Sequence, residues 1–176
     1  MPIEMTDEAL PIESMPMRED FEAFYTRERR AVLGLAYVLS GSRSGAEDLA
    51  QEAFIAAFRR WDEISEYDDP GAWVRRVAAN KATSWIRRRA AEARALLRMK
   101  GPDFTVPALD AEADLIWKEV RRLPTRQAQV VALRYLDARE VSEIAGVLQC
   151  SVNTVHTHLR RAKQKLARRL DDKDLR

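Results

Sequence analysis

Apolar residues recur every three or four positions along most of this chain, and this spacing is what most limits the fold. The first run begins at Asp20. A spacing of three and four places apolar side chains on one face of an α-helix, whereas a half-buried strand would alternate. The 176 residues include 6 glycines and 7 prolines, few for the turns of an all-β protein. The sequence therefore predicts an all-α protein. The residues of the first run are Phe21, Phe24, Tyr25, Val32, Leu35, Ala36 and Leu39.

Two breaks divide residues 18–93 into three predicted helices. The first break is the SGSRSG segment, residues 40–45, after which Ser44 and Glu47 have the S-x-x-E spacing of a capping box. The second break is the acidic stretch 62–71, which predicts a loop. Three amphipathic helices of this length can enclose one core.

The third helix has a clear start signal, because Asp69 and Pro70 match an N-cap followed by proline at the first helical position. After it, residues 94–110 contain one glycine and two prolines and predict a flexible linker. A second helical domain is predicted over 111–176, with Thr125 capping one of its helices. Residues 1–17 have three prolines and no helical period, and we expect a disordered arm.

Charge is distributed unevenly along the chain. The net charge is +2, but residues 1–19 carry five acids and one base, whereas residues 111–176 carry fourteen bases and nine acids. A polyanion is therefore expected to bind the C-terminal part. The sequence has no transmembrane-length apolar run and no signal peptide, and its lone Cys150 suits a reducing compartment. We expect a cytoplasmic protein.

Residues 140–170 contain the most specific pattern. A short periodic segment, 140–148, precedes a tight turn at Gln149–Cys150, and Ser151 is placed to cap a helix over 152–170. This arrangement predicts a helix-turn-helix, whose second helix lies in the major groove of DNA. We expect Val152, Val155, Leu159, Ala162 and Leu166 to face inward, and Asn153, Thr154, His156, Thr157 and Arg160 to face outward.

Two other interpretations of this helix compete with the DNA-binding one, and the metal site is the weaker of them. Residues 151–170 contain no acid, so their basic side chains can neutralise phosphates, but a basic helix end is also favoured by the helix dipole alone. A metal site is the other interpretation. His156 and His158 are two residues apart and project about 200° apart on a helix, so they cannot share an ion. Cys150 is expected to be a small core residue.

Three segments together resemble the extracytoplasmic-function (ECF) sigma factors, of the group 4 type. They are AEDLAQEAFIAAFRRWDEI, DPGAWVRRVAANKATSWIRRR and LPTRQAQVVALRYLDAREVSEIAGVLQCSVNTVHTHLRRAKQKL. The resemblance covers residues 20–170 and implies two helical domains, sigma2 and sigma4, joined by a linker. It also implies a protein that binds core RNA polymerase through the β′ and β subunits and recognises the −35 and −10 elements of promoter DNA. The resemblance further implies an anti-sigma factor as a partner that holds the protein inactive, action at the nucleoid within the holoenzyme, and no cofactor.

The resemblance assigns residues to each partner. For the core polymerase they are Asp48, Gln51, Glu52, Phe54 and Arg59, although Phe54 and Phe58 also fit a core. For the −10 element, a loop over residues 64–69 would hold a flipped base, and the residues are Tyr67, Trp73, Arg75, Arg76, Asn80, Lys81, Arg87 and Arg88. For the −35 element they are Ser151, Asn153, Thr154, His156, Thr157, Arg160, Arg161 and Lys163. Trp73 and Trp85 also fit a core.

Two departures from the family pattern concern single contacts. Ser84 stands where many members have aspartate, and Asn153 stands where a small residue is common.

Two other functions remain open: a dimeric helix-turn-helix regulator, and a helical adaptor or anti-sigma mimic that binds only protein. The sequence shows no nucleophile–base pair, phosphate loop or metal cluster, and we expect no enzymatic activity.

Overall fold

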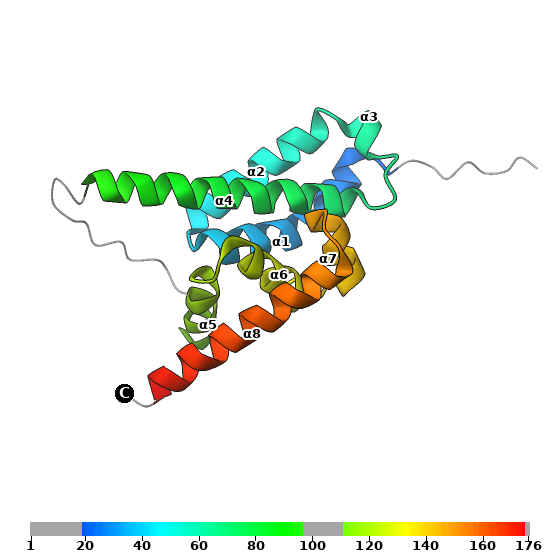
Figure 1. The fold of residues 1–176 in the computed structure, drawn as a ribbon. Helices are drawn as coiled ribbons and strands as arrows, with labels where there is room; N and C mark the ends of the chain where they lie inside the picture. The colour runs from blue at the N-terminus through cyan, green and yellow to red at the C-terminus, as the bar shows by residue number, and fades with distance from the viewer. Residues whose placement is uncertain (1–18, 97–110, 175–176) are drawn as a thin grey trace, which may run out of the picture.

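The computed structural model describes residues 19–96 and 111–174, and every regular element in these two ranges is an α-helix, which confirms the all-α prediction (Figure 1). The expected arm over 1–17 and most of the expected linker lie outside the described residues. The helices are α1 (Phe21–Ser40), α2 (Arg43–Phe58), α3 (Trp61–Ile64), α4 (Pro70–Leu96), α5 (Ala111–Arg121), α6 (Thr125–Tyr135), α7 (Val141–Leu148) and α8 (Val152–Asp174).

Two predicted helix starts are confirmed. The backbone N–H of Ala72 donates to Asp69 Oδ1 over 2.9 Å, so Asp69 caps α4, and Pro70 is the first residue of this helix. The N–H of Thr154 donates to Ser151 Oγ over 3.1 Å at the start of α8. In both cases the cap and its partner are three residues apart, so the local sequence suffices to specify them.

Two other predicted caps are wrong. The N-cap of α2 is Ser42, whose Oγ accepts from the N–H of Gly45 over 3.1 Å, so the predicted cap Ser44 lies inside the helix. Thr125 is the first helical residue of α6, and its N-cap is Pro124, whose side chain makes no capping hydrogen bond. The carbonyl of Pro124 instead accepts from the N–H groups of Gln127 and Ala128.

An aromatic cluster fills the core beside α3. Phe24, Phe54, Ile64 and Trp73 are buried in it, and the ring of Phe24 lies 4.6 Å from that of Trp61, centroid to centroid. Burial of each large apolar side chain contributes about 1.5–3 kcal/mol. The short helix α3 thus closes one end of the packing between α1, α2 and α4.

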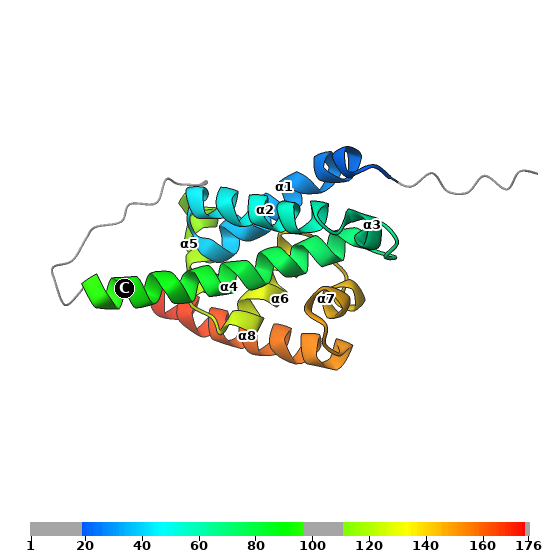
Figure 2. The same cartoon turned by 90° about the horizontal axis from the view of Figure 1, so that it is seen from above.

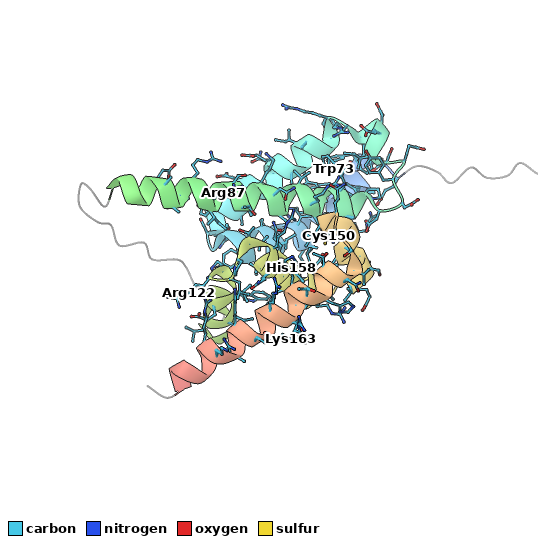
Figure 3. All side chains as sticks on the ribbon, viewed as in Figure 1. Trp73, Arg87, Arg122, Cys150, His158 and Lys163 are labelled. Carbon is cyan, nitrogen blue, oxygen red and sulfur yellow. The ribbon has the colours of Figure 1, made fainter. Side chains whose placement is uncertain are left out.

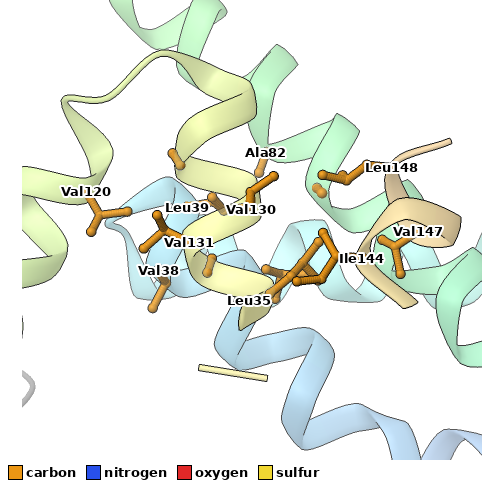
Figure 4. Close-up of a cluster of buried hydrophobic side chains, with 14 of the residues drawn as sticks. Leu35, Val38, Leu39, Ala82, Val120, Val130, Val131, Ile144, Val147 and Leu148 are labelled. Atoms are coloured by element: carbon orange, nitrogen blue, oxygen red, sulfur yellow. The ribbon is translucent and has the colours of Figure 1, made fainter. Parts of the chain in front are cut away.

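A second core joins the two halves of the described structure, α1–α4 and α5–α8. Leu35 from the first half and Val130 and Ile144 from the second are fully buried in one continuous cluster (Figure 4). Helices α6 and α7 contact α1 and α4 on one side and α8 on the other (Figure 1). The first half therefore has a core of its own beside α3 and shares a second core with the other half.

Polar contacts add to this junction. Arg75 of α4 donates from Nη1 to Glu28 Oε2 of α1 and from Nε to Asp137 Oδ2 beyond α6, each over 2.6 Å. The buried Gln129 of α6 donates from Nε2 to the carbonyl of Ala79 over 3.1 Å. These bonds satisfy groups that would be costly to bury without partners.

The C-terminal end of α4 projects from the rest of the helices. In two views at right angles, the C-terminal end of this helix extends past the ends of α1, α2 and α8 (Figures 1 and 2). Its 27 residues correspond to a length of about 40 Å. Within residues 19–96 and 111–174, no helix combines the length and apolarity needed to cross a bilayer.

Candidate nucleic-acid interface

Helices α7 and α8 form the predicted helix-turn-helix. Glu140 and Glu143 form a capping box at the start of α7, with the Glu140 N–H donating to Glu143 Oε2 over 2.6 Å. The helix ends at Gln149, which has a left-handed conformation with φ 51°. The N–H of Cys150 donates to the carbonyl of Ala145 over 3.0 Å, and Ser151 starts the next helix. A tight, hydrogen-bonded turn thus fixes the angle between the two helices.

The face of α8 that the sequence assigned to DNA is largely exposed. Thr154 and Thr157 are half-buried, and Lys163 lies with its Nζ 5.9 Å from the centre of the Tyr135 ring (Figure 3). The prediction that Val152 faces inward is wrong. This side chain is 43% exposed, because it lies in the first turn of α8, beyond the end of the core. The exposed members of the assigned set are Ser151, Asn153, His156, Arg160, Arg161 and Lys163.

The two histidines of α8 have different environments. His156 is exposed, whereas His158 is half-buried, with a buried Nδ1 that has no hydrogen-bond partner. Burial lowers the pKa of His158, and the nearby charges of Arg161 and Arg126 lower it further. In the described parts of the chain, no three histidine, cysteine or acidic side chains are grouped to hold a metal ion. The basic face of α8 therefore suits phosphate better than a cation.

Helix α4 presents a second basic surface. Asn80, Arg87 and Arg88 are exposed, and Arg76 is half-buried. Arg87 lies on the outer part of α4 (Figure 3). Lys81 is half-buried, and its Nζ donates to Glu52 Oε2 over 2.6 Å. Among the described residues, Lys81 is therefore the one of these five side chains that pairs with a carboxylate; Arg76, Asn80, Arg87 and Arg88 do not.

Two residues assigned to this surface lie inside the fold. Arg75 is 3% exposed, because its guanidinium is held by Glu28 and Asp137, so in this arrangement it has no access to DNA. Trp73 is 9% exposed and packs in the aromatic core, with the Arg60 guanidinium carbon 5.7 Å from its ring centre. Trp73 is therefore a core residue, which is the alternative that the sequence also allowed.

The segment before α4 is shorter than the predicted loop. Residues Trp61–Ile64 form α3, and the buried Ile64 anchors it, so the irregular part spans only 65–69. Tyr67 is 39% exposed in this part, and its hydroxyl donates to the Glu63 carboxylate. This hydrogen bond raises the pKa of Tyr67. An exposed ring held by its hydroxyl can stack with a base.

A third surface lies on α2. Asp48, Gln51 and Glu52 are exposed together, and Arg59 follows the end of the helix. Phe54, which was assigned to this surface, is instead 4% exposed and packs on Tyr25, with the ring centroids 4.8 Å apart. Phe54 therefore supports the helix from within.

Two apolar residues beside this surface were not predicted to be exposed. Phe58 is 63% exposed, although its position also fitted a core, and Ile55 is 42% exposed. The spacing of 48, 52, 55 and 59 could have indicated Ile55, since residues three and four apart share a helix face. Exposed large apolar side chains next to charged ones are typical of protein-binding sites.

Comparison with known proteins identifies the family. Residues 24–92 match the family model "Sigma-70 region 2", and residues 113–166 match "Sigma-70, region 4". An RNA polymerase sigma-E factor of Streptomyces avermitilis is 31% identical over 159 residues, covering 89% of this chain and 88% of the relative. The ECF RNA polymerase sigma factor SigW of Bacillus subtilis is 27% identical over 154 residues, covering 78% and 82%. The chain belongs to the family of ECF RNA polymerase sigma factors.

This sigma factor also shares its fold with solved relatives. The sigma factor RpoE of Bartonella quintana, solved with the anti-sigma factor NepR, has a TM-score of 0.71 and 20% identity over 86% of this chain and 97% of that one. CnrH, solved with the cytosolic domain of CnrY, has a TM-score of 0.62 and 24% identity over 86% and 88%. The predicted sigma-factor fold is confirmed, and the group 4 subtype stays a prediction.

Family membership fixes the general activity. As an ECF sigma factor, the protein directs promoter-specific transcription initiation by RNA polymerase. This result favours the sigma-factor hypothesis over a stand-alone dimeric regulator and over an adaptor that binds only protein.

Proposed function

We propose that each of the three surfaces of this sigma factor binds one partner. The exposed face of α2 binds core polymerase, α4 and the segment before it bind the −10 element, and the start of α8 binds the −35 element. The observation that carries the proposal is the exposed polar and basic face of α8, positioned by the capped turn after α7. The catalytic centre belongs to the polymerase, and we propose no enzymatic activity for the sigma factor itself.

The −35 contact follows from the side chains at the start of α8. Asn153 and His156 are exposed in the first turns, where short polar groups can approach base edges in the major groove. Arg160 and Arg161 follow one turn later and can bind phosphates or guanine. We therefore assign sequence recognition to the first two turns of α8 and backbone contacts to the rest.

For the −10 element, we propose that Tyr67 stacks on an unpaired base while Asn80, Arg87 and Arg88 follow the strand. Stacking on aromatic rings and contacts from basic side chains are the usual means of holding single strands. Trp73 and Arg75 are left out of this assignment because they are buried. Capture of an unpaired strand would favour melting of the duplex.

The two DNA surfaces cannot both be used while the halves are packed together. The −35 and −10 elements lie about 25 base pairs apart, which corresponds to roughly 85 Å of duplex. In the described structure, α7 contacts both α4 and α8, so the two surfaces belong to one compact unit. We propose that the halves separate when the sigma factor binds polymerase and promoter.

Anti-sigma control is proposed on the same basis. Of the two solved relatives named above, RpoE was captured with the anti-sigma factor NepR, and CnrH with the cytosolic domain of CnrY. A packed form, with the −35 and −10 surfaces too close for a promoter, is a form that such a partner could hold. Regulation of this protein by an anti-sigma factor therefore accompanies the proposal.

The test is transcription in vitro. The purified protein is mixed with bacterial core RNA polymerase and fragmented genomic DNA of its host, and RNA 5′ ends are mapped. Discrete start sites that share upstream elements, and that are missing with core alone, would support the proposal. Binding to DNA without core, and no new start sites, would contradict it.

A further inference from the structure

A cavity of about 840 Å³ lies where the two halves of the protein meet. Leu33 and Tyr37 of α1 line it on one side, and Trp117 of α5 and Leu136 beyond α6 line it on the other. Leu136 is 40% exposed, a high value for leucine next to a core. The lining of the cavity is mostly apolar, so binding of an apolar occupant there would remove apolar surface from water and be favourable.

The same cavity has a basic side. Arg27, Arg30 and Arg43 line it, against two acids, Glu47 and Asp137. Asp137 is already held by arginines outside the cavity, and Glu47 pairs with Arg43 over 3.3 Å. Within residues 19–96 and 111–174, Arg30 has no ion-pair partner. A suitable occupant therefore has apolar side chains and carboxylates together.

We propose that residues 1–17 of this chain occupy the cavity. Their composition matches it, because the stretch through Glu19 has a net charge of −4 and interleaves acids with apolar residues. Intramolecular docking needs only weak intrinsic affinity, since a short tether keeps the local concentration in the millimolar range. The relevant residues are Ile3, Met5, Leu10, Ile12, Met15 and Met17 with Glu4, Asp7, Glu8 and Glu13.

The start of α1 lies close to the cavity. Glu19 lies just before the N-cap Asp20, yet its carboxylate pairs with Arg27, which lines the cavity. From Phe21 to Tyr37 the helix rises about 24 Å, whereas seventeen residues can extend over about 56 Å. The segment is therefore long enough to reach the lining residues of α1 from Arg27 to Tyr37.

The basic face of α8 is the main competing site within the chain. Its exposed residues, among them Arg160, Arg161 and Lys163, could attract the acids of residues 1–17. However, no residue of α8 lines this cavity, and the exposed large apolar side chains on the described part of α8 are Val152 and Leu170, far apart along the helix, so that face offers fewer apolar contacts to the segment. The cavity satisfies both the charge and the apolar character of the segment.

Occupation of the cavity would affect how the halves associate. An occupant contacts α1 and α2 of the first half and α5 and Leu136 of the second at once. It would therefore stabilise the packed arrangement. An effect of this docking on transcription rests on the proposed function, in which the two halves separate when the protein binds polymerase. The docking itself does not depend on that function.

Site-specific photo-cross-linking tests the docking directly. Leu10 is replaced by p-benzoylphenylalanine in the full chain, and cross-linked peptides are identified by mass spectrometry after irradiation. We expect cross-links to peptides that contain Leu33, Tyr37, Trp117 or Leu136. Cross-links to α8, cross-links spread over the whole surface, or none at all would overturn the proposal.

A mixture of isotopically heavy and light protein separates docking within one chain from docking between copies. Cross-links within one copy support the proposal, and cross-links mainly between copies overturn it in favour of a dimer. This readout needs no polymerase, so its failure would leave the sigma-factor activity untouched.

Charge exchange provides the matched control. Arg30→Glu with Arg43→Glu should lower the cross-link yield about tenfold, as expected when two attractive pairs become repulsive. Adding Glu8→Lys and Glu13→Lys should restore it. Arg87→Glu with Arg88→Glu, two exposed arginines on α4, should leave the yield unchanged. An unchanged yield in the first variant, or no restoration in the second, would contradict the docking.

Discussion

Arg75 and Asp137 are 62 residues apart in the sequence, and their side chains meet between the two halves of the protein, with Nε 2.6 Å from Oδ2. Both side chains are nearly buried, at 4% and 6% exposure. The same guanidinium also binds Glu28 of α1. One arginine of α4 thus joins α1 to the second half, in a setting where loss of any partner leaves a buried charge.

Replacement of this arginine should be costly. Arg75→Met keeps much of the side-chain volume but leaves Glu28 and Asp137 without their shared partner. We expect the free energy of unfolding to fall by about 3–5 kcal/mol, measured by urea denaturation. Arg87→Met, an exposed change on the same helix, should alter it by less than about 0.5 kcal/mol. A loss below about 1 kcal/mol in Arg75→Met would show that the ion pairs contribute little.

The stability of the protein should also depend on the ionisation of Glu28. Burial acts to raise the pKa of this carboxyl, but hydrogen bonds from Arg27 and Arg75 and their charges outweigh burial, so the pKa lies below its usual 4.5. A carboxyl with a lowered pKa stabilises the fold fully above its unfolded pKa and loses this effect as pH falls through the folded pKa. The stabilisation should therefore be complete above about pH 5 and decline below 4.5.

Comparison with Glu28→Gln isolates this contribution. The variant should be less stable than the wild type at pH 7, and the difference between the two should shrink as pH falls below 4.5. Urea unfolding curves at several pH values would measure the difference. A difference that stays constant from pH 7 to pH 3 would exclude Glu28 ionisation as its source.

Two glycines should respond oppositely to alanine. At Gly34, within α1, an added Cβ would lie 3.6 Å from Leu136, an ordinary contact, so Gly34→Ala should stabilise the protein by about 0.5–1 kcal/mol. At Gly45 the added Cβ would lie 2.8 Å from the ring of Trp85, so Gly45→Ala should destabilise it by about 1–3 kcal/mol. Thermal unfolding of the two variants would test both signs together. Stabilisation by Gly45→Ala would mean that Trp85 can move aside freely.

The assignment of the α2 surface can be tested by loss of polymerase binding. Asp48→Ala with Gln51→Ala removes two exposed side chains, so holoenzyme formation should weaken while the fold stays intact. Affinity for core polymerase and circular dichroism would be measured together. Glu22→Ala, an exposed acid on α1, is the control and should bind normally. Native dichroism with unchanged core affinity in the double variant would remove these residues from the interface.

Arg160 on α8 should contribute to promoter affinity in the holoenzyme. If it contacts a base, Arg160→Ala should cost about 1–3 kcal/mol and relax specificity at one position of the −35 element. If it contacts phosphate, the loss of affinity should be similar on all sequences. The slope of log affinity against log salt concentration should then become shallower by about one. Binding titrations at several salt concentrations would distinguish the two. No change in affinity on any sequence would leave Arg160 without a role in DNA binding.

Features that depend on neighbouring residues were predicted well. The helical period located the main helices, and Asp69 and Ser151 were correctly placed as caps, because a cap bonds to a backbone group three positions away. The turn at Gln149 was also predicted, as it lies between two periodic segments. Where two nearby residues could each serve as the cap, the prediction selected the wrong one. For α2 it selected Ser44, whereas the cap is Ser42.

The roles of individual side chains depended on which element covers each helix. The sequence of α4 shows Arg75 and Arg76 as adjacent basic residues, yet Arg75 is buried because Asp137 reaches it from the second half. On α2, Phe54 is buried and Phe58 is 63% exposed, although both are aromatic and share a helix face.

The sequence by itself therefore determined the helices, their order, the helix-turn-helix and the resemblance to a family, because local periodicity and capping depend on residues close together in the chain. Only the tertiary structure decided that α6 and α7 pack on α1 and α4, that Arg75 serves as an internal ion pair, and that a cavity lies between the halves. A helical period shows which face is apolar, but the partner that covers this face is selected by packing between residues far apart in the sequence.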